Sequence, residues 1–399
     1  MRASAAREPI LAFALLGALV IVGVKVASSQ HSQEVVAKPT ATLAQPSPKP
    51  KPTHRVVPAS TRPAGPSDSH RLRHVTTIGG AITPKSVDAS SAGFVTAQNM
   101  IYQHSITVYD DHTYTLHKTI SDRVTLSNFG FTKYHQPVRG GPVEAAFTPD
   151  GRYEYVSNYS MYGPGFGHPG HDKCSPSSSY DRSFLYRIDL STLKIDQAIQ
   201  VGAVPKYLVV TPDDKYVLVS NWCSYSLSVV SVATGKQIRQ LYVGSYPRGI
   251  AVNKQSTTAY VAVMGTSDLA RVSLDNFTVR DVYVGPNPRH VVIDPAGHYL
   301  YVTLNAAGKV VKFDLQTDHV VGTVSTGQDP RSMVIAPDGR SLYVVNYTSN
   351  TMSKLRTSDM KVLQAVDTPT HPIGITFDPR TGDVWVACYH GAIAVFADR

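Results

Sequence analysis

The stretch that decides the fold spans residues 330–346 and reads PRSMVIAPDGRSLYVVN. It begins with a proline and a basic residue, continues with an apolar run, and turns at Ala336-Pro337-Asp338-Gly339. The segment after the turn, Tyr343-Val344-Val345-Asn346, is rich in the β-branched and aromatic residues that favour strands. This pattern predicts two short strands joined by a tight turn.

The same unit recurs along the chain. Proline–basic pairs stand at Pro205-Lys206, Pro247-Arg248, Pro288-Arg289 and Pro330-Arg331, and Pro372 follows, so that the units are about 42 residues long. Two further anchors, Pro84 and Pro142, begin longer units that contain insertions. Four short strands per unit are typical of one blade of a β-propeller. We therefore expect an all-β fold, a propeller of seven four-stranded antiparallel blades over residues 71–399.

The last unit is too short to contain four strands, because the chain ends at residue 399, shortly after Pro372. An N-terminal segment, His74 to Gly79, resembles the outer-strand segment His319 to Val324 of another unit. We expect this segment to pair with residues 392–396 and close the ring, which leaves no free sheet edge. Its deletion should destabilise the domain severely.

The residues before the propeller are of two other kinds. Arg2 and Arg7 precede an apolar run over residues 10–24, so residues 1–29 are interpreted as a signal peptide or, with residues 10–27 uncleaved, as a membrane anchor. Residues 30–70 are rich in proline and predict a disordered spacer. Export to the periplasm or cell surface follows from either interpretation.

The formal net charge of +9 does not by itself indicate a nucleic-acid-binding domain. Through Arg73 there are ten basic and three acidic residues, a net of +7. Residues 74–399 hold the remaining 28 basic and 26 acidic residues, which is only +2. Most of the excess therefore lies before the repeats of the propeller.

One face of the ring carries the candidate binding site. The loops that enter the first strand and leave the second strand of each blade open on the same face, close to the central channel. Basic residues that begin innermost strands are predicted to line it: Lys85, Lys206, Arg248, Arg289 and Arg331. Further candidates on this face are His290, Tyr159, Trp222 and Tyr347. Such cations and aromatic rings could bind an anionic ligand, or they could hold neighbouring blades together; the sequence leaves both open. Two long insertions, residues 127–141 and 159–180, fall on the same face, where function is usually concentrated.

The recurring Tyr-Val-x-Asn tetrads, such as Tyr155-Val156-Ser157-Asn158 and Tyr343-Val344-Val345-Asn346, resemble the YVTN-repeat β-propeller family, the YncE-like proteins of bacterial envelopes. The resemblance covers about residues 74–399. It implies an exported, WD40-like repeat propeller without implying a single chemistry. Because YncE-like proteins have been linked to single-stranded DNA, it also suggests single-stranded nucleic acid as a partner.

The cysteines and histidines of the second insertion allow two interpretations. His168, His171, Asp172 and Cys174 could contribute to a metal site. A Cys174–Cys223 disulfide between adjacent loops is the simpler interpretation for an exported protein. Cys388 is then left as a buried free thiol. No Cys-x-x-Cys-His run is present for covalent haem attachment, and no cofactor is expected.

Two classes of function follow from the sequence. The first is a monomeric, non-catalytic binding or scaffold propeller that recognises an anionic small molecule, a polymer or an envelope protein. The second is an enzyme resembling the lactonases built on propellers, with Glu144 and His290 as acid–base candidates beside Arg289. A resemblance to the propeller of haem-dependent nitrite reductases is a third, lesser interpretation. The binding protein is the main expectation and the hydrolase the alternative.

Overall fold

The computed structural model describes residues 65–399. The predicted signal or anchor and most of the predicted spacer lie outside these residues. Residues 67–70, which the sequence analysis assigns to the spacer, contact the propeller in this structure. Within the described range no helix is long and apolar enough to cross a membrane.

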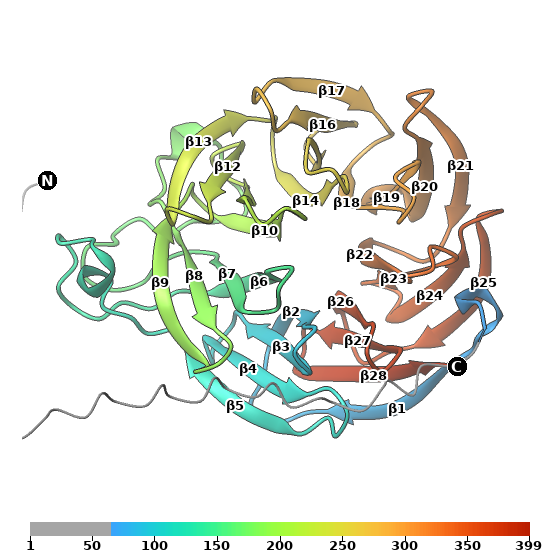
Figure 1. Ribbon diagram of the computed structural model, residues 1–399, viewed down its shortest axis with the longest axis horizontal. Coiled ribbons are helices and arrows are strands. Elements are labelled where there is room, and N and C mark those ends of the chain that lie inside the picture. Colours follow the sequence, from blue (N-terminus) through green and yellow to red (C-terminus); the bar gives the residue numbers. More distant parts are fainter. Residues whose placement is uncertain (1–64) are drawn as a thin grey trace, which may run out of the picture. The chain divides into compact units, whose positions relative to one another are not determined.

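The chain forms the predicted seven-bladed propeller, in which each blade is a four-stranded antiparallel sheet (Figure 1). Blades 1 to 3 contain β2 (Pro84–Ala89), β3 (Phe94–Asn99), β4 (Ser105–Asp110), β5 (Leu116–Ser121); β6 (Pro142–Phe147), β7 (Tyr153–Asn158), β8 (Phe184–Asp189), β9 (Lys194–Gln200); and β10 (Pro205–Val210), β11 (Tyr216–Asn221), β12 (Ser226–Ser231), β13 (Lys236–Tyr242). Blades 4 and 5 contain β14 (Pro247–Val252), β15 (Thr258–Val263), β16 (Asp268–Ser273), β17 (Val279–Tyr283); and β18 (Pro288–Ile293), β19 (Tyr299–Leu304), β20 (Lys309–Asp314), β21 (His319–Ser325). Blade 6 contains β22 (Pro330–Ile335), β23 (Ser341–Asn346), β24 (Thr351–Arg356), β25 (Lys361–Asp367), and blade 7 contains β26 (Pro372–Asp378), β27 (Asp383–Cys388), β28 (Ala392–Asp398) and β1 (Leu72–Ile78). Short 3-10 turns lie at η1 (Ser67–Ser69), η2 (Leu126–Phe129), η3 (Pro176–Ser178) and η4 (Asn305–Ala307).

The N-terminal strand closes the ring, as predicted. β1 pairs antiparallel with β28 from Leu72 opposite Asp398 to Ile78 opposite Ile393, and Figure 1 shows the blue strand beside the red one. A buried ammonium group reinforces this closure, because Lys354 forms a salt bridge with Asp398. The same Nζ donates to the carbonyl oxygens of Ser67 at 2.7 Å and His70 at 2.9 Å. The first and last segments of the propeller are therefore held by one charged centre.

Each innermost strand begins at the proline that marks its repeat. Proline has no N–H to donate, so the first residue of a strand is a position it tolerates. In all seven blades the register shifts immediately after this proline. Such a bulge re-aims the side chains beside it. In blade 3, for example, Pro205 pairs with Asn221 and Tyr207 with Ser220, which leaves Lys206 between them without a partner in the ladder.

Apolar side chains of neighbouring blades form the core between the sheets. Leu342, Tyr343, Val344 and Val345 of β23 are all fully buried, and they contact side chains of blades 5 and 7. Strands buried on both faces read as continuous apolar runs, which is the pattern of the recurring tetrads.

A methyl group added at Gly374, on the innermost strand β26, tests how closely the innermost strands of neighbouring blades approach each other. A Cβ on Gly374 would lie 2.6 Å from the Cα of Ser86 and 3.0 Å from the carbonyl oxygen of Lys85. Because backbone cannot move aside cheaply, we expect Gly374→Ala to lower the free energy of unfolding by about 1–3 kcal/mol in urea titrations. Gly79→Ala, where a Cβ would meet nothing within 4 Å, is the control and should change it by less than about 0.5 kcal/mol. Equal stability of the two variants would contradict this packing.

Candidate functional site

Five cations meet at the channel, and we refer to them as the cation cluster. They are the residues that follow the first proline of β2, β10, β14, β18 and β22, namely Lys85, Lys206, Arg248, Arg289 and Arg331. The first four are only 5–8% exposed, and Arg331 is half-buried. The bulge after each proline explains their common direction, because it takes the second residue out of the ladder.

Only two members of the cation cluster have carboxylate partners among the described residues. Lys85 Nζ lies 3.0 Å from an oxygen of Glu144, and Lys206 Nζ lies 2.7 Å from one of Asp172. Glu144 belongs to β6, whereas Asp172 belongs to the insertion after β7, so each pair joins neighbouring blades.

The three arginines have weaker neighbours. Arg331 stacks on the ring of Tyr347 at 3.5 Å, and its Nε is buried without a hydrogen-bond partner in the described structure. Arg248 lies 5.6 Å from the ring of Trp222, and an Nη of Arg289 lies 3.7 Å from the sulfur of Met264. Buried charges are normally paired. Three uncompensated guanidinium groups at one place therefore favour binding of an anion.

Burial and mutual repulsion shift the titration of this cluster. Burial lowers the pKa of Lys85 to about 8 against the attraction of Glu144. Burial, followed by the charge of Arg248, lowers the pKa of Lys206 to about 7. Burial and the charges of Arg248 and Arg331 also bring the pKa of Arg289 well below its usual range. The buried surroundings and the neighbouring cations therefore disfavour the charged forms of these side chains.

Two small cavities adjoin the cluster. One of about 10 Å³ is lined by Glu144, Tyr207, Arg248, Gly249, Arg289, His290, Arg331 and Ser332. The other, of about 80 Å³, shares Glu144, Tyr207 and His290 and extends to Asp88 and Thr376. The first is the size of one water molecule.

His290 is the candidate base of this site. It is 6% exposed, and its ring meets that of Tyr207 edge to face at 5.0 Å. Burial, and then the cations Arg289, Arg248 and Lys85, lower its pKa to about 3. The imidazole is therefore uncharged at neutral pH. Its Nδ1 is buried without a hydrogen-bond partner in the described structure, so this atom is available to a ligand.

Two further acids have raised pKa values, namely Asp88, which is half-buried and lines the second cavity, and Glu154, which is fully buried. Burial raises the pKa of Asp88 to about 8 and that of Glu154 to about 8. Glu154 accepts hydrogen bonds from the Thr96 hydroxyl and the Gln98 amide. At neutral pH these carboxyl groups are therefore mostly protonated and do not neutralise the cation cluster.

The three aromatic residues predicted for this face, Tyr159, Trp222 and Tyr347, lie against members of the cation cluster. The Lys206 ammonium lies 4.3 Å from the ring of Tyr159 and 5.4 Å from that of Trp222. The Arg331 guanidinium lies over the ring of Tyr347. Cation–π contacts of this kind partly compensate a charge without neutralising it. Tyr159 also donates its hydroxyl to Asp172 at 3.1 Å, so the rings position the loop carboxylate as well.

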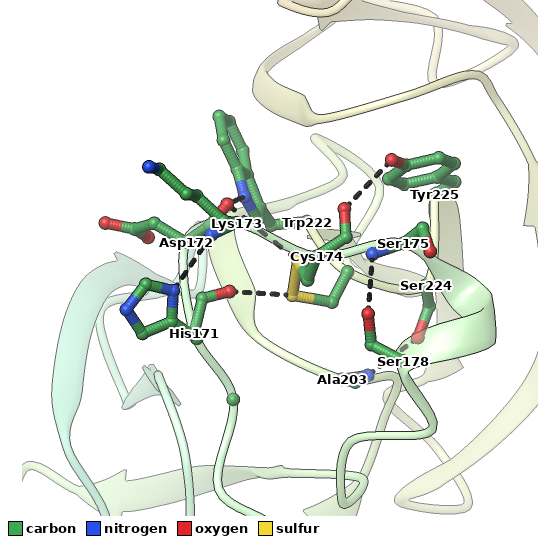
Figure 2. The surroundings of a disulfide bond; sticks show 12 residues. His171, Asp172, Lys173, Cys174, Ser175, Ser178, Ala203, Trp222, Ser224 and Tyr225 are labelled. Atoms are coloured by element: carbon green, nitrogen blue, oxygen red, sulfur yellow. Dashed lines mark hydrogen bonds between the residues drawn. A yellow bond between two sulfur atoms is a disulfide. The ribbon is translucent and has the colours of Figure 1, made fainter.

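A disulfide between Cys174 and Cys223 anchors the second insertion beside the cluster (Figure 2). The indole of Trp222 donates to the carbonyl oxygen of Asp172 at 2.8 Å, and the Tyr225 hydroxyl donates to that of Cys174 at 3.0 Å. These bonds tie the loop to blade 3. They hold Asp172 within reach of Lys206, which β10 contributes to the channel.

The other candidates of the insertion are not brought together. Nδ1 of His168 lies 3.1 Å from the Ser179 carbonyl oxygen, and Nδ1 of His171 accepts the backbone N–H of Lys173. In residues 65–399 no three His, Cys, Asp or Glu side chains lie together as a metal site. Cys388 is a buried free thiol whose pKa burial raises to about 12.

Sequence reasoning did not include Tyr207, Asp88 and Glu154 in the site. The sequence does contain a feature that points to Tyr207, because this residue follows Pro205-Lys206 just as His290 follows Pro288-Arg289. Aligning the repeats at the third position would have placed both side chains in the channel. Asp88 and Glu154 have no such marker, since their importance depends on burial.

Comparisons with known proteins support the fold and one chemical suggestion. The family model described as Arylesterase matches residues 290–398, a stretch from β18 to β28 that contains His290 and Arg331. A chain of Kuenenia stuttgartiensis hydrazine synthase has a similar structure, with a TM-score of 0.61 and 17% sequence identity. The match covers 79% of this chain and 96% of that one, and at this identity it concerns the fold alone. No curated protein matches the chain in sequence.

Proposed function

We propose that the protein is a hydrolase that acts on a negatively charged ester or lactone at the channel mouth. The observation that carries this proposal is the juxtaposition of three unpaired arginines with an uncharged, unpartnered imidazole around one small cavity. The partial similarity to arylesterases supports it, because the matched stretch contains His290 and Arg331. These comparisons favour the hydrolase, the alternative of the sequence analysis, over its main interpretation of a binding protein.

The arginines would bind the substrate through its negative group. Arg248, Arg289 and Arg331 line one cavity, and none of them forms a salt bridge with a carboxylate of residues 65–399, since Glu144 in the same cavity pairs with Lys85. Guanidinium groups in a water-poor site also stabilise the oxyanion that develops on an attacked carbonyl group. The energetic cost of leaving these charges unpaired in the free protein would thus be recovered when the substrate binds.

His290 would act as the general base. A water molecule attacks the carbonyl carbon and gives its proton to Nδ1 of His290, and the resulting oxyanion faces the arginines. The tetrahedral intermediate then expels the alkoxide, which takes the proton from the imidazole, and an acid and an alcohol result. Burial is the main reason for the low pKa of His290, and a substrate anion would offset the smaller contribution of the neighbouring cations and so raise this pKa. Glu144 lines the same cavity and is the second acid–base candidate.

A panel of lactones and aryl esters, with and without a carboxylate, tests the proposal. We expect turnover of charged members, and a fall in kcat/KM of about a hundredfold or more for His290→Asn and Glu144→Gln. His319→Asn, at an exposed position of the outer strand β21, is the control. Thermal melting establishes that the variants fold. Absence of turnover across the panel would contradict the hydrolase.

A non-catalytic anion-binding propeller is the second candidate. The unpaired arginines favour it directly, because they require an anion but no base. This function predicts that calorimetry shows saturable binding of charged esters and that no product forms. The affinity should be the same in the His290→Asn variant. The bound negative group would then be part of a small molecule, a polymer, a nucleic acid or an envelope protein.

For the location of the protein we propose export to the periplasm or the cell surface. The basic and apolar N-terminus supports it, and the Cys174–Cys223 disulfide is typical of an oxidising compartment. A cell-fractionation experiment that recovers the protein in the cytoplasm would contradict this location.

A further inference from the structure

The charge balance at the channel restricts what the site can bind. Within residues 65–399, Lys85 and Lys206 are the only members of the cation cluster with carboxylate partners, so the charges of the three arginines have no salt-bridge partner there. The nearby acids Asp88 and Glu154 do not supply the missing charge, since burial raises their pKa values to about 8. A single negative charge would leave most of this excess in place.

The shape of the site restricts the ligand further. Arg248 and Arg289 are 8% and 7% exposed, so little of either side chain reaches open solvent. The Asp172 side chain, in contrast, is 68% exposed and reaches Lys206 from the insertion. This loop carboxylate therefore approaches the cluster from the solvent side. Because Arg248, Arg289 and Arg331 line one small cavity, negative charges that lie close together are needed to face all three.

We propose that the ligand or substrate of this site carries a compact group with two or three negative charges, such as a sulfate, a phosphate ester or a tricarboxylate. This inference rests on the location of the site in the proposed function and narrows its substrate class. It does not require that the site is catalytic.

Proton uptake follows from the groups that surround the cluster. Lys206 faces Asp172, Arg248 and Lys85, and Lys85 faces Glu144, Arg248 and Arg289. Their pKa values are lowered to about 7 and about 8, so a fraction of each is uncharged above neutral pH. A bound anion raises the pKa of these two lysines and of the neighbouring Asp88, whose pKa burial raises to about 8. All of these shifts take up protons, and affinity should therefore fall as the pH rises from 7 to 9.

Calorimetry with defined anions tests the inference. Sulfate and citrate are the multivalent probes and acetate is the monovalent one; sulfate does not titrate in this range, so protons taken up must go to the protein. We expect sulfate and citrate to bind at least tenfold more tightly than acetate at pH 7.5. Sulfate titrations at pH 8 in buffers of different ionisation enthalpy should show net proton uptake. Acetate binding as tightly as sulfate would overturn the proposal.

Variants separate the cluster from general surface charge. Arg289→Gln should weaken sulfate binding at least tenfold, whereas Lys236→Gln on the outer strand β13 should not change it. Lys206→Met should reduce the number of protons taken up, a readout that a general loss of packing would not produce. Equal effects of Arg289→Gln and Lys236→Gln would overturn the assignment to the channel. Because sulfate is not hydrolysed here, these results are independent of any esterase assay.

Discussion

Removal of residues 65–78 is expected to unfold the propeller at ordinary temperatures. The deletion takes away β1, exposes the edge of β28, and leaves Lys354 without the carbonyl oxygens of Ser67 and His70. A chain that begins at residue 79 should therefore show no cooperative transition in urea, while one that begins at residue 65 unfolds cooperatively. Equal melting temperatures would contradict the role of β1 in closing the ring.

The single substitution Lys354→Met should reproduce part of this effect. It leaves Asp398 buried without its ammonium partner, and breaking a buried ion pair on one side typically costs about 3–5 kcal/mol. The matched control is Lys361→Met on the same blade, where the Lys361 side chain is 72% exposed and exposed pairs contribute less than about 1 kcal/mol. Urea titrations of both variants measure the difference.

Loss of the Cys174–Cys223 disulfide should have the second large effect. The bridge joins residues 49 positions apart, and loop-closure entropy for that length corresponds to about 4 kcal/mol of stability. We expect the double variant Cys174→Ser/Cys223→Ser to be destabilised by about this amount in urea. A reductant should lower the stability of the natural protein and leave the double variant unchanged. A natural protein that is insensitive to reductant would show that the bridge contributes nothing.

The fold could be predicted because the same pattern of proline, apolar run and turn recurs in each repeat. The prolines at the seven anchors are the first residues of the seven innermost strands, and the blade they predict is the one observed. The closing strand was predicted at residues 74–79 and is β1 at Leu72–Ile78. The YVTN-type resemblance agrees with this architecture, while the comparisons support the propeller and a partial likeness to arylesterases.

The candidate site was only partly predictable. The positions of the five cations follow from the repeat, because equivalent residues of a ring occupy equivalent places. Their partners do not, since Lys85 meets a glutamate of the next blade and Lys206 meets Asp172 from an insertion that has no counterpart in other repeats. Asp172 was considered as a metal ligand in the sequence and is instead an ion-pair partner. The protonation of Asp88 and the neutrality of His290 depend on burial and summed charge, which a single sequence does not show.

The pairing of β1 with β28 also bears on how the chain folds. The two strands are separated by nearly the entire propeller, so the contact that completes the last blade has a very large sequence separation. Contacts of this kind form slowly because loop-closure entropy opposes them. A growing chain cannot make this contact until its last residues are synthesised, so the blades formed earlier wait in an open arc with an unpaired strand edge. Such edges promote aggregation, and the slow step of folding should therefore be the final closure of the ring.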